Sequence, residues 1–193
     1  MNPELKLLGI SQKTYDFVKS CENSLGNIYE GIEANEAYTQ ARVLKAFQDN
    51  CIALRHFAPT SGYGYDDIGR EALGAVFACA LEAEDALVRP QISSGTQAIF
   101  TALSGLLEPG DVMLSLTGKP YDTLEKAIGI SGDEYCSLKR MGVIYRQVDL
   151  TADGHIDIDA AKAAITGSEK VIYFQRSRGY SWRNALTPEE MAP

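Results

Sequence analysis

The 193-residue sequence suits one domain, or one domain and part of another, and its 45% hydrophobic and 23% charged residues are typical of a globular protein. A net charge of −8 without any cluster of Lys and Arg argues against a nucleic-acid partner. No apolar run approaches the roughly 20 residues that cross a bilayer, and the first residues lack the order of a signal peptide, so we expect a cytoplasmic protein.

Cysteines and histidines give no sign of a metal site. The four cysteines form no C-x-x-C pair, and the two histidines, His56 and His155, lie far apart in the sequence. Cys79 lies among Ala and Phe in a helical pattern, so we expect it to be a small core residue.

Residues 1–57 are predicted to form an N-terminal helical segment. Apolar residues at helical spacing predict two helices within residues 4–53, and Gly26 and Gly31 indicate a break before Glu33. Such a leading pair fits either a small bundle or an arm that lies on a partner subunit.

The stretch 58–67 contains Pro, Ser and two Gly, which predict a loop. Its two tyrosines, Tyr63 and Tyr65, have the aromatic body and hydroxyl that serve ligands and interfaces, although structural tyrosines are commoner. Asp67 suits the beginning of a helix over 67–82.

The stretch Ala86–Leu107 predicts a strand, a tight turn and a helix. Ala86–Val88 form a short apolar run, Ser93–Thr96 are small turn residues, and the apolar residues that follow repeat at helical spacing. Because the first N–H groups of a helix lack intrahelical partners, this turn is a plausible phosphate cradle. A serine-capped helix with no ligand is the alternative.

From there to the end, strands and helices alternate, which predicts an α/β fold with a mostly parallel sheet flanked by helices. We assign residues 58–193 to this second domain. Strands are expected at 111–117, 143–150 and 170–175, helices at 121–130 and 158–165, and a helix start at Thr187-Pro188.

In a parallel sheet the ligand lies beyond the carboxyl ends of the strands. The loops expected there are 93–96, 117–121, 151–154 and 176–183, and three of them are rich in Ser, Thr, Tyr, Lys and Arg. A phosphate-binding Walker loop, a dinucleotide fingerprint and a nucleophile elbow all fail on the required residues.

Four strings point to a family. GYGYDDIGREALGAVFA, followed by LEAEDALVRPQISSGTQAI, LTGKPYDTLE and YFQRSRGYSWR, resembles the methionine γ-lyase-like group, also labelled aluminium resistance proteins. The resemblance implies a pyridoxal-phosphate enzyme of sulfur amino-acid metabolism with the aspartate-aminotransferase-type fold, fold type I. It further implies a homodimer or homotetramer with the coenzyme at a subunit interface, and makes this chain the first part of the large domain with a helical arm.

The same resemblance assigns coenzyme-binding residues. Ser94, Gly95 and Thr96 resemble the family's phosphate cup, and Tyr121 resembles the tyrosine that stacks on the pyridine ring. Tyr63 and Tyr65 resemble the loop that reaches the neighbouring subunit's phosphate site.

Related lyases carry Tyr-x-Arg in that loop, whereas the third residue here is Tyr65. Arg70 is either a substitute for the missing arginine or a solvated helix charge. On the substrate side, Arg176, Arg178 and Arg183 are candidates to hold a carboxylate, or are surface charges, and we select Arg178.

The family's Schiff-base lysine and pyridine-binding aspartate follow strands that lie beyond this sequence, and neither Lys119 nor Asp149 is assigned these roles. We therefore expect the N-terminal part of a carbon–sulfur lyase acting on a sulfur-containing amino acid, inactive alone. A non-catalytic module that dimerises or binds a partner is the alternative, and a nucleotide-binding α/β protein is a third.

Overall fold

The computed structural model describes residues 3–61, 67–132 and 134–191. It divides into two compact units, Met1–Arg89 and Pro90–Pro193. Tyr63 and Tyr65 lie outside the described residues. None of the described helices combines the length and apolar character that a bilayer crossing requires.

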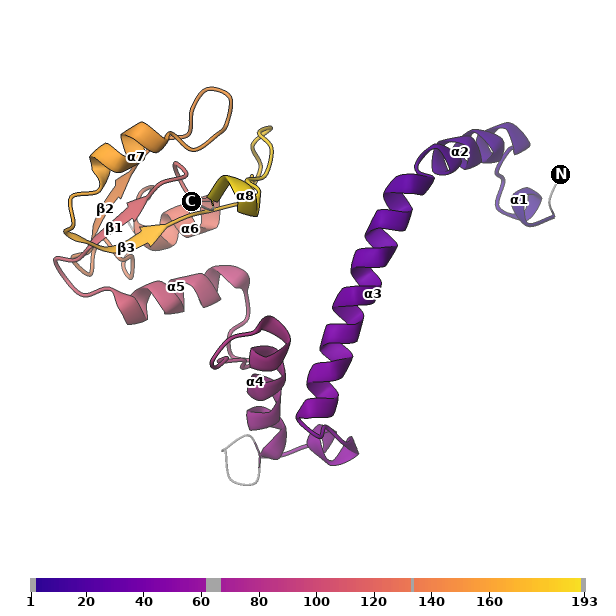
Figure 1. Cartoon of the computed structure of the whole chain (residues 1–193), viewed down its shortest axis with the longest axis horizontal. Coiled ribbons are helices and arrows are strands. Elements are labelled where there is room, and N and C mark those ends of the chain that lie inside the picture. Colours follow the sequence, from indigo (N-terminus) through magenta and orange to yellow (C-terminus); the bar gives the residue numbers. More distant parts are fainter. Residues whose placement is uncertain (1–2, 62–66, 133, 192–193) are drawn as a thin grey trace. The chain divides into compact units, whose positions relative to one another are not determined.

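The described part of the first unit is helical (Figure 1). Ser11 caps the second helix by accepting a hydrogen bond from the Thr14 N–H. The chain breaks at Leu25, and Gly31 lies inside a long helix, so the predicted break before Glu33 is wrong. One glycine costs about 1 kcal/mol in a helix interior, too little to end a helix of 24 residues. The helices are α1 (Pro3–Leu7), α2 (Gln12–Ser24), α3 (Gly26–Asp49), the short 3-10 helix η1 (Leu54–Phe57) and α4 (Ile68–Leu81).

Helix α4 packs against α3 and η1, which places it in the first unit rather than with the sheet. The Arg42 guanidinium on α3 donates a hydrogen bond to the Ala80 carbonyl at 2.6 Å. The boundary between the two units therefore lies after Arg89, whereas the sequence suggested residue 57.

The segment after α4 lies against that helix. A Cβ on Gly74 would come 2.7 Å from the Ala86 carbonyl oxygen, so the backbones approach closely at this glycine. Within the described chain Ala86–Val88 belong to no strand, and the strand predicted there is wrong because this stretch packs on a helix. Cys79 is exposed rather than buried, because α4 buries Gly74, Val76 and Ala78 instead.

The second unit is an α/β layer structure. Its three described strands are parallel in the order β2-β1-β3, which confirms the alternation predicted from the sequence. The elements are α5 (Gly95–Leu106), β1 (Val112–Ser115), α6 (Asp122–Ile128), β2 (Ile144–Gln147), α7 (Ile158–Ala164), β3 (Glu169–Tyr173) and α8 (Pro188–Met191).

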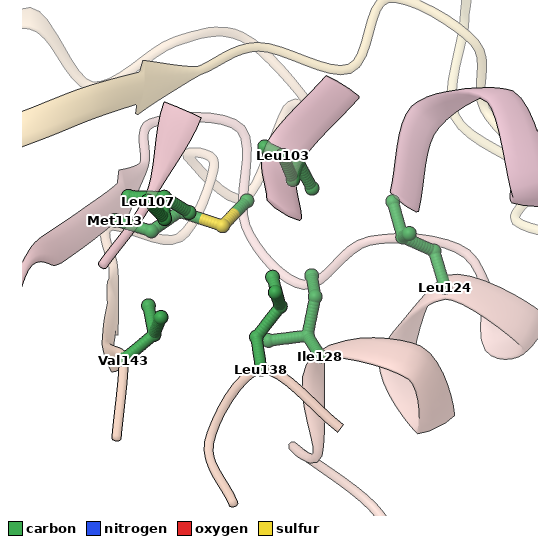
Figure 2. Close-up of a cluster of buried hydrophobic side chains, with 7 residues drawn as sticks. All are labelled: Leu103, Leu107, Met113, Leu124, Ile128, Leu138 and Val143. Atoms are coloured by element: carbon green, nitrogen blue, oxygen red, sulfur yellow. The ribbon is translucent and has the colours of Figure 1, made fainter. Parts of the chain in front are cut away.

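The central strand β1 contributes side chains to two hydrophobic cores, because successive side chains of a strand point to opposite faces of the sheet. Met113 packs with residues of α5 and α6 on one face, and Leu114 packs with Ala161 of α7 on the other. Figure 1 shows α7 on one side of the sheet and α5 with α6 on the other. The first core is drawn in Figure 2 and comprises Leu103, Leu107, Met113, Leu124, Ile128, Leu138 and Val143.

An ion pair spans the sheet between its two outer strands. The Arg146 guanidinium on β2 contacts the Glu169 carboxylate on β3, whose side chain is 2% exposed. Burial alone would raise the pKa of Glu169, but hydrogen bonds from the Thr166 hydroxyl and the N–H groups of Thr166 and Gly167 outweigh it and lower the pKa to about 2.

The lowered pKa of Glu169 predicts an acid-dependent loss of stability. A carboxyl whose pKa falls from 4.5 to about 2 on folding stabilises the fold above about pH 4.5, and that contribution is lost as the pH falls towards about 2. We expect Glu169→Gln to be less stable than wild type near pH 7, and the difference to shrink below about pH 4.5. Urea unfolding at several pH values measures this, with the exposed Glu108→Gln as control. A difference that stays constant down to about pH 2 would contradict it.

Candidate functional site

A pocket of about 390 Å³ lies at the carboxyl ends of the strands in the second unit. Its walls come from residues 117–122 after β1, Leu150 after β2, and the loop after β3 that includes Gln175 and Arg178, with Glu125 of α6 completing them. The site therefore lies where a parallel sheet is expected to bind its ligand.

Two residues predicted to bind the coenzyme meet beside this pocket. The Tyr121 hydroxyl lies 3.2 Å from the Thr96 hydroxyl oxygen, which also lies 2.9 Å from the Thr123 hydroxyl. Tyr121 lines the pocket, and Thr96 adjoins it through this hydrogen bond. The beginning of α5 and the loop after β1 thus share one edge of the sheet.

The turn before α5 combines a helix cap with open backbone donors. The Ser94 hydroxyl accepts a hydrogen bond from the Gln97 N–H at 3.1 Å, so this serine is engaged as the N-cap. The Gly95 and Thr96 N–H groups form no hydrogen bond with another described residue. A Cβ on Gly95 would meet nothing within 4 Å. The positive end of the helix dipole adds to this place's suitability for an anion.

The backbone of Tyr121 is fixed from the neighbouring strand. Its N–H donates to the Gln175 side-chain oxygen at 3.1 Å, where the chain enters α6. Nearby, burial raises the pKa of Tyr173, and the proximity of Tyr121 raises it further. Tyr173 therefore remains a neutral hydroxyl.

The three candidate arginines differ in their contacts. Arg176 donates from Nε to the Leu186 carbonyl at 3.0 Å, and Arg183 donates to the Ser177 carbonyl at 2.7 Å, so both hold the loop in place. Arg178 is exposed and lines the pocket. Arg183 lines the same pocket, but of the three arginines only Arg178 forms no guanidinium hydrogen bond within the described residues.

The remaining candidates have structural partners. Lys119 lies 3.1 Å from the Glu125 carboxylate, and both line the pocket. Arg70 lies in the first unit and pairs with Asp67 at 3.3 Å. Asp149 accepts a hydrogen bond from the Gln147 side chain at 2.7 Å. In the described ranges, no group of three or more His, Cys, Asp and Glu is arranged to hold a metal ion.

Sequence reasoning missed Gln175 and Glu125, which both line the pocket. Gln175 follows the third predicted strand directly, so its place at a carboxyl strand end was the available signal. In the sequence, Glu125 looks like a solvent-exposed charged residue of a helix. Only the structure shows that its side chain is 11% exposed and lies beside Lys119.

The fold and the site define a class. This is an α/β protein whose parallel sheet presents a serine-capped helix start and an aromatic side chain at its carboxyl edge. The sequence model of the methionine gamma-lyase family matches residues 14–193, and the chain belongs to that family.

Similar proteins agree with this assignment. A Bacillus subtilis (strain 168) protein named "Uncharacterized protein YnbB" is 47% identical over 171 residues, which cover 88% of this chain and 41% of that protein. The crystal structure of a "putative cystathionine beta-lyase involved in aluminum resistance" from Listeria innocua is 44% identical with a TM-score of 0.87, over 92% of this chain and 43% of that one.

A further structure, of a "carbon-sulfur lyase involved in aluminum resistance" from Clostridium novyi NT, is 39% identical with a TM-score of 0.86. The match covers 97% of this chain and 45% of that one. The chain thus spans less than half the length of these relatives. The family expected from the residue strings is confirmed.

Proposed function

We propose that this chain forms the part of a carbon–sulfur lyase that holds the phosphate and the ring of pyridoxal 5′-phosphate. The observation that carries the proposal is the hydrogen bond between Thr96 and Tyr121, which joins an open helix start to an aromatic side chain of the pocket. The names of the Listeria and Clostridium structures support the class of reaction.

The residues present fit this coenzyme. The N–H groups of Gly95 and Thr96 would donate to the phosphate, and the absence of a side chain at Gly95 leaves space for it. The flat side chain of Tyr121 would lie against the ring and fix its orientation. When bound, the coenzyme withdraws electrons from the α-carbon of an amino acid.

Arg178 would bind the substrate. Its guanidinium carries a fork of N–H donors that matches a carboxylate, so it would orient the α-carboxylate of a sulfur-containing amino acid. Lys119 and Glu125, which form an ion pair on the same pocket wall, would set the charge near the substrate.

We also propose that the assembled protein is a homodimer or a homotetramer. Large apolar side chains of α2 and α3 are exposed, among them Phe17, Ile28, Ile32 and Leu44. Exposed apolar surface of this extent is typical of interaction surfaces.

The variant Gly95→Ala tests the phosphate site. The methyl group meets no other atom of the described structure within 4 Å, so the fold should be kept or slightly stabilised, by up to about 1 kcal/mol. The same methyl group fills the space that the phosphate needs. Loss of one charge-assisted hydrogen bond costs about 1.5–3 kcal/mol, so affinity should fall about tenfold to a hundredfold.

Isothermal titration with pyridoxine 5′-phosphate measures this, because the ligand carries no aldehyde that could react with surface lysines. Unphosphorylated pyridoxine should bind wild type and variant alike. Gly105→Ala is the matched control, since it adds the same methyl group to α5, also into open space. If wild type does not bind pyridoxine 5′-phosphate, or if Gly95→Ala binds it equally well, the proposal fails.

A further inference from the structure

We infer that Gln175 is a positioning residue that fixes Tyr121 and the Arg178 loop relative to one another. The inference deepens the proposed function and rests on it for the meaning of the pocket. Gln175 lies just beyond β3 and lines the pocket, and the residue is partly buried.

Both ends of the Gln175 side chain are used. The oxygen accepts from the Tyr121 N–H at 3.1 Å and, more weakly, from the Tyr173 hydroxyl at 3.5 Å. The amide nitrogen donates to the Ser177 carbonyl at 3.2 Å. One planar amide therefore connects the loop after β1 with the loop after β3.

The backbone of Gln175 adds to this connection. Its N–H donates to the Thr117 hydroxyl at 2.8 Å, and its carbonyl accepts from Arg183 at 3.4 Å. The strand end is thus anchored on both sides, so the position of the side-chain oxygen is well defined. The Tyr121 N–H donates to that oxygen, so the hydrogen bond fixes the backbone from which the tyrosine side chain extends.

A second glutamine shows what is particular to Gln175. Gln147 lies at the end of β2, accepts from the Tyr145 hydroxyl two residues before it at 3.0 Å, and donates to Asp149 two residues after it at 2.7 Å. Gln175 repeats this pattern with Tyr173 and Ser177. Among the side-chain contacts of the described residues, Gln175 differs from Gln147 by its hydrogen bond to the Tyr121 N–H.

The consequence concerns the pair of Tyr121 and Thr96. If Gln175 no longer holds the Tyr121 N–H, the entry to α6 gains freedom, and the tyrosine hydroxyl loses its fixed distance to Thr96. The ring and the phosphate site would then no longer be held together. The coenzyme would meet a site that must be ordered on binding, which lowers affinity.

The test uses the full chain with Gln175→Leu, Gln175→Glu and, as matched control, Gln147→Leu. Amide hydrogen exchange at Tyr121, followed by NMR, reads the hydrogen bond without any ligand. We expect exchange about tenfold faster in Gln175→Leu, near wild type in Gln175→Glu, whose carboxylate still accepts from the N–H, and unchanged in Gln147→Leu.

Affinity for pyridoxine 5′-phosphate is the second readout, and we expect it to fall about tenfold in Gln175→Leu and to stay at the wild-type value in Gln147→Leu. Unchanged Tyr121 exchange in Gln175→Leu, or an equal effect of Gln147→Leu, would overturn the inference. If Gln175→Leu does not fold, fast Tyr121 exchange in folded Gln175→Glu also overturns it. A third outcome separates the two proposals. If Tyr121 exchange is faster in Gln175→Leu but the wild type does not bind pyridoxine 5′-phosphate, the proposed function is refuted and the positioning role is supported.

Discussion

Replacing Leu124 with alanine should lower the free energy of unfolding of the sheet-containing unit by about 2–5 kcal/mol. Leu124 has no exposed surface and lies in the core cluster between α5, α6 and the sheet (Figure 2). The substitution removes apolar contacts and leaves a cavity that the packed neighbours can fill only in part. Urea unfolding followed by circular dichroism measures the change.

The control for this variant is Leu106→Ala on α5. Leu106 is 56% exposed, so the same change in chemistry removes little buried surface there. We expect it to cost less than about 1 kcal/mol. Equal losses for the two variants would show that the core around Leu124 is not packed as described.

Replacing Tyr121 with alanine should weaken the binding of pyridoxine 5′-phosphate by about tenfold to a hundredfold. An aromatic side chain stacked on a flat heterocycle contributes about 1–3 kcal/mol by alanine substitution. Tyr121→Phe keeps the ring and its packing against the core but loses the hydrogen bond to Thr96, so we expect a smaller loss. Fluorescence or calorimetric titration measures both variants.

Two checks accompany this prediction. Tyr135→Ala removes an 84% exposed tyrosine of the same unit and should leave affinity unchanged. Circular dichroism must show that Tyr121→Ala is folded, because Tyr121 also packs against the core. Wild-type affinity in a folded Tyr121→Ala chain would contradict the assignment of this ring.

Local patterns explain what could be predicted about the elements. The three strands and the helices between them were predicted because alternating apolar runs and turn residues carry their own signal. The strand predicted at Ala86–Val88 was wrong because a short apolar run does not reveal whether it packs beside a strand or on a helix. The helix break predicted from Gly31 was also wrong, because a glycine inside a long helix is tolerated when the residues on both sides favour the helix.

The candidate site was predictable to a similar degree. The family resemblance assigned Tyr121 to the coenzyme ring, and small residues before a helix, together with the resemblance, assigned Ser94, Gly95 and Thr96 to the phosphate. The structure shows that Thr96 and Tyr121 meet, and the binding roles stay predictions. The sequence could not predict which of the three arginines would bind backbone carbonyl groups. Folding brings carbonyl groups within hydrogen-bond distance of Arg176 and Arg183, and this contact distinguishes them from Arg178. Sequence strings alone determined the family, which the family match and the solved structures confirm.

By itself, then, the sequence determined the parallel α/β layering, the serine cap of α5 and the family of the chain. Only the tertiary structure decided that Thr96 and Tyr121 meet, that Arg178 faces the pocket, and that Gln175 connects two strand ends. The physical reason is distance along the chain: caps, periodicity and turns act between residues a few positions apart. The bond from Gln175 to Tyr121 spans 54 positions and exists only because β1 and β3 are neighbours in the sheet.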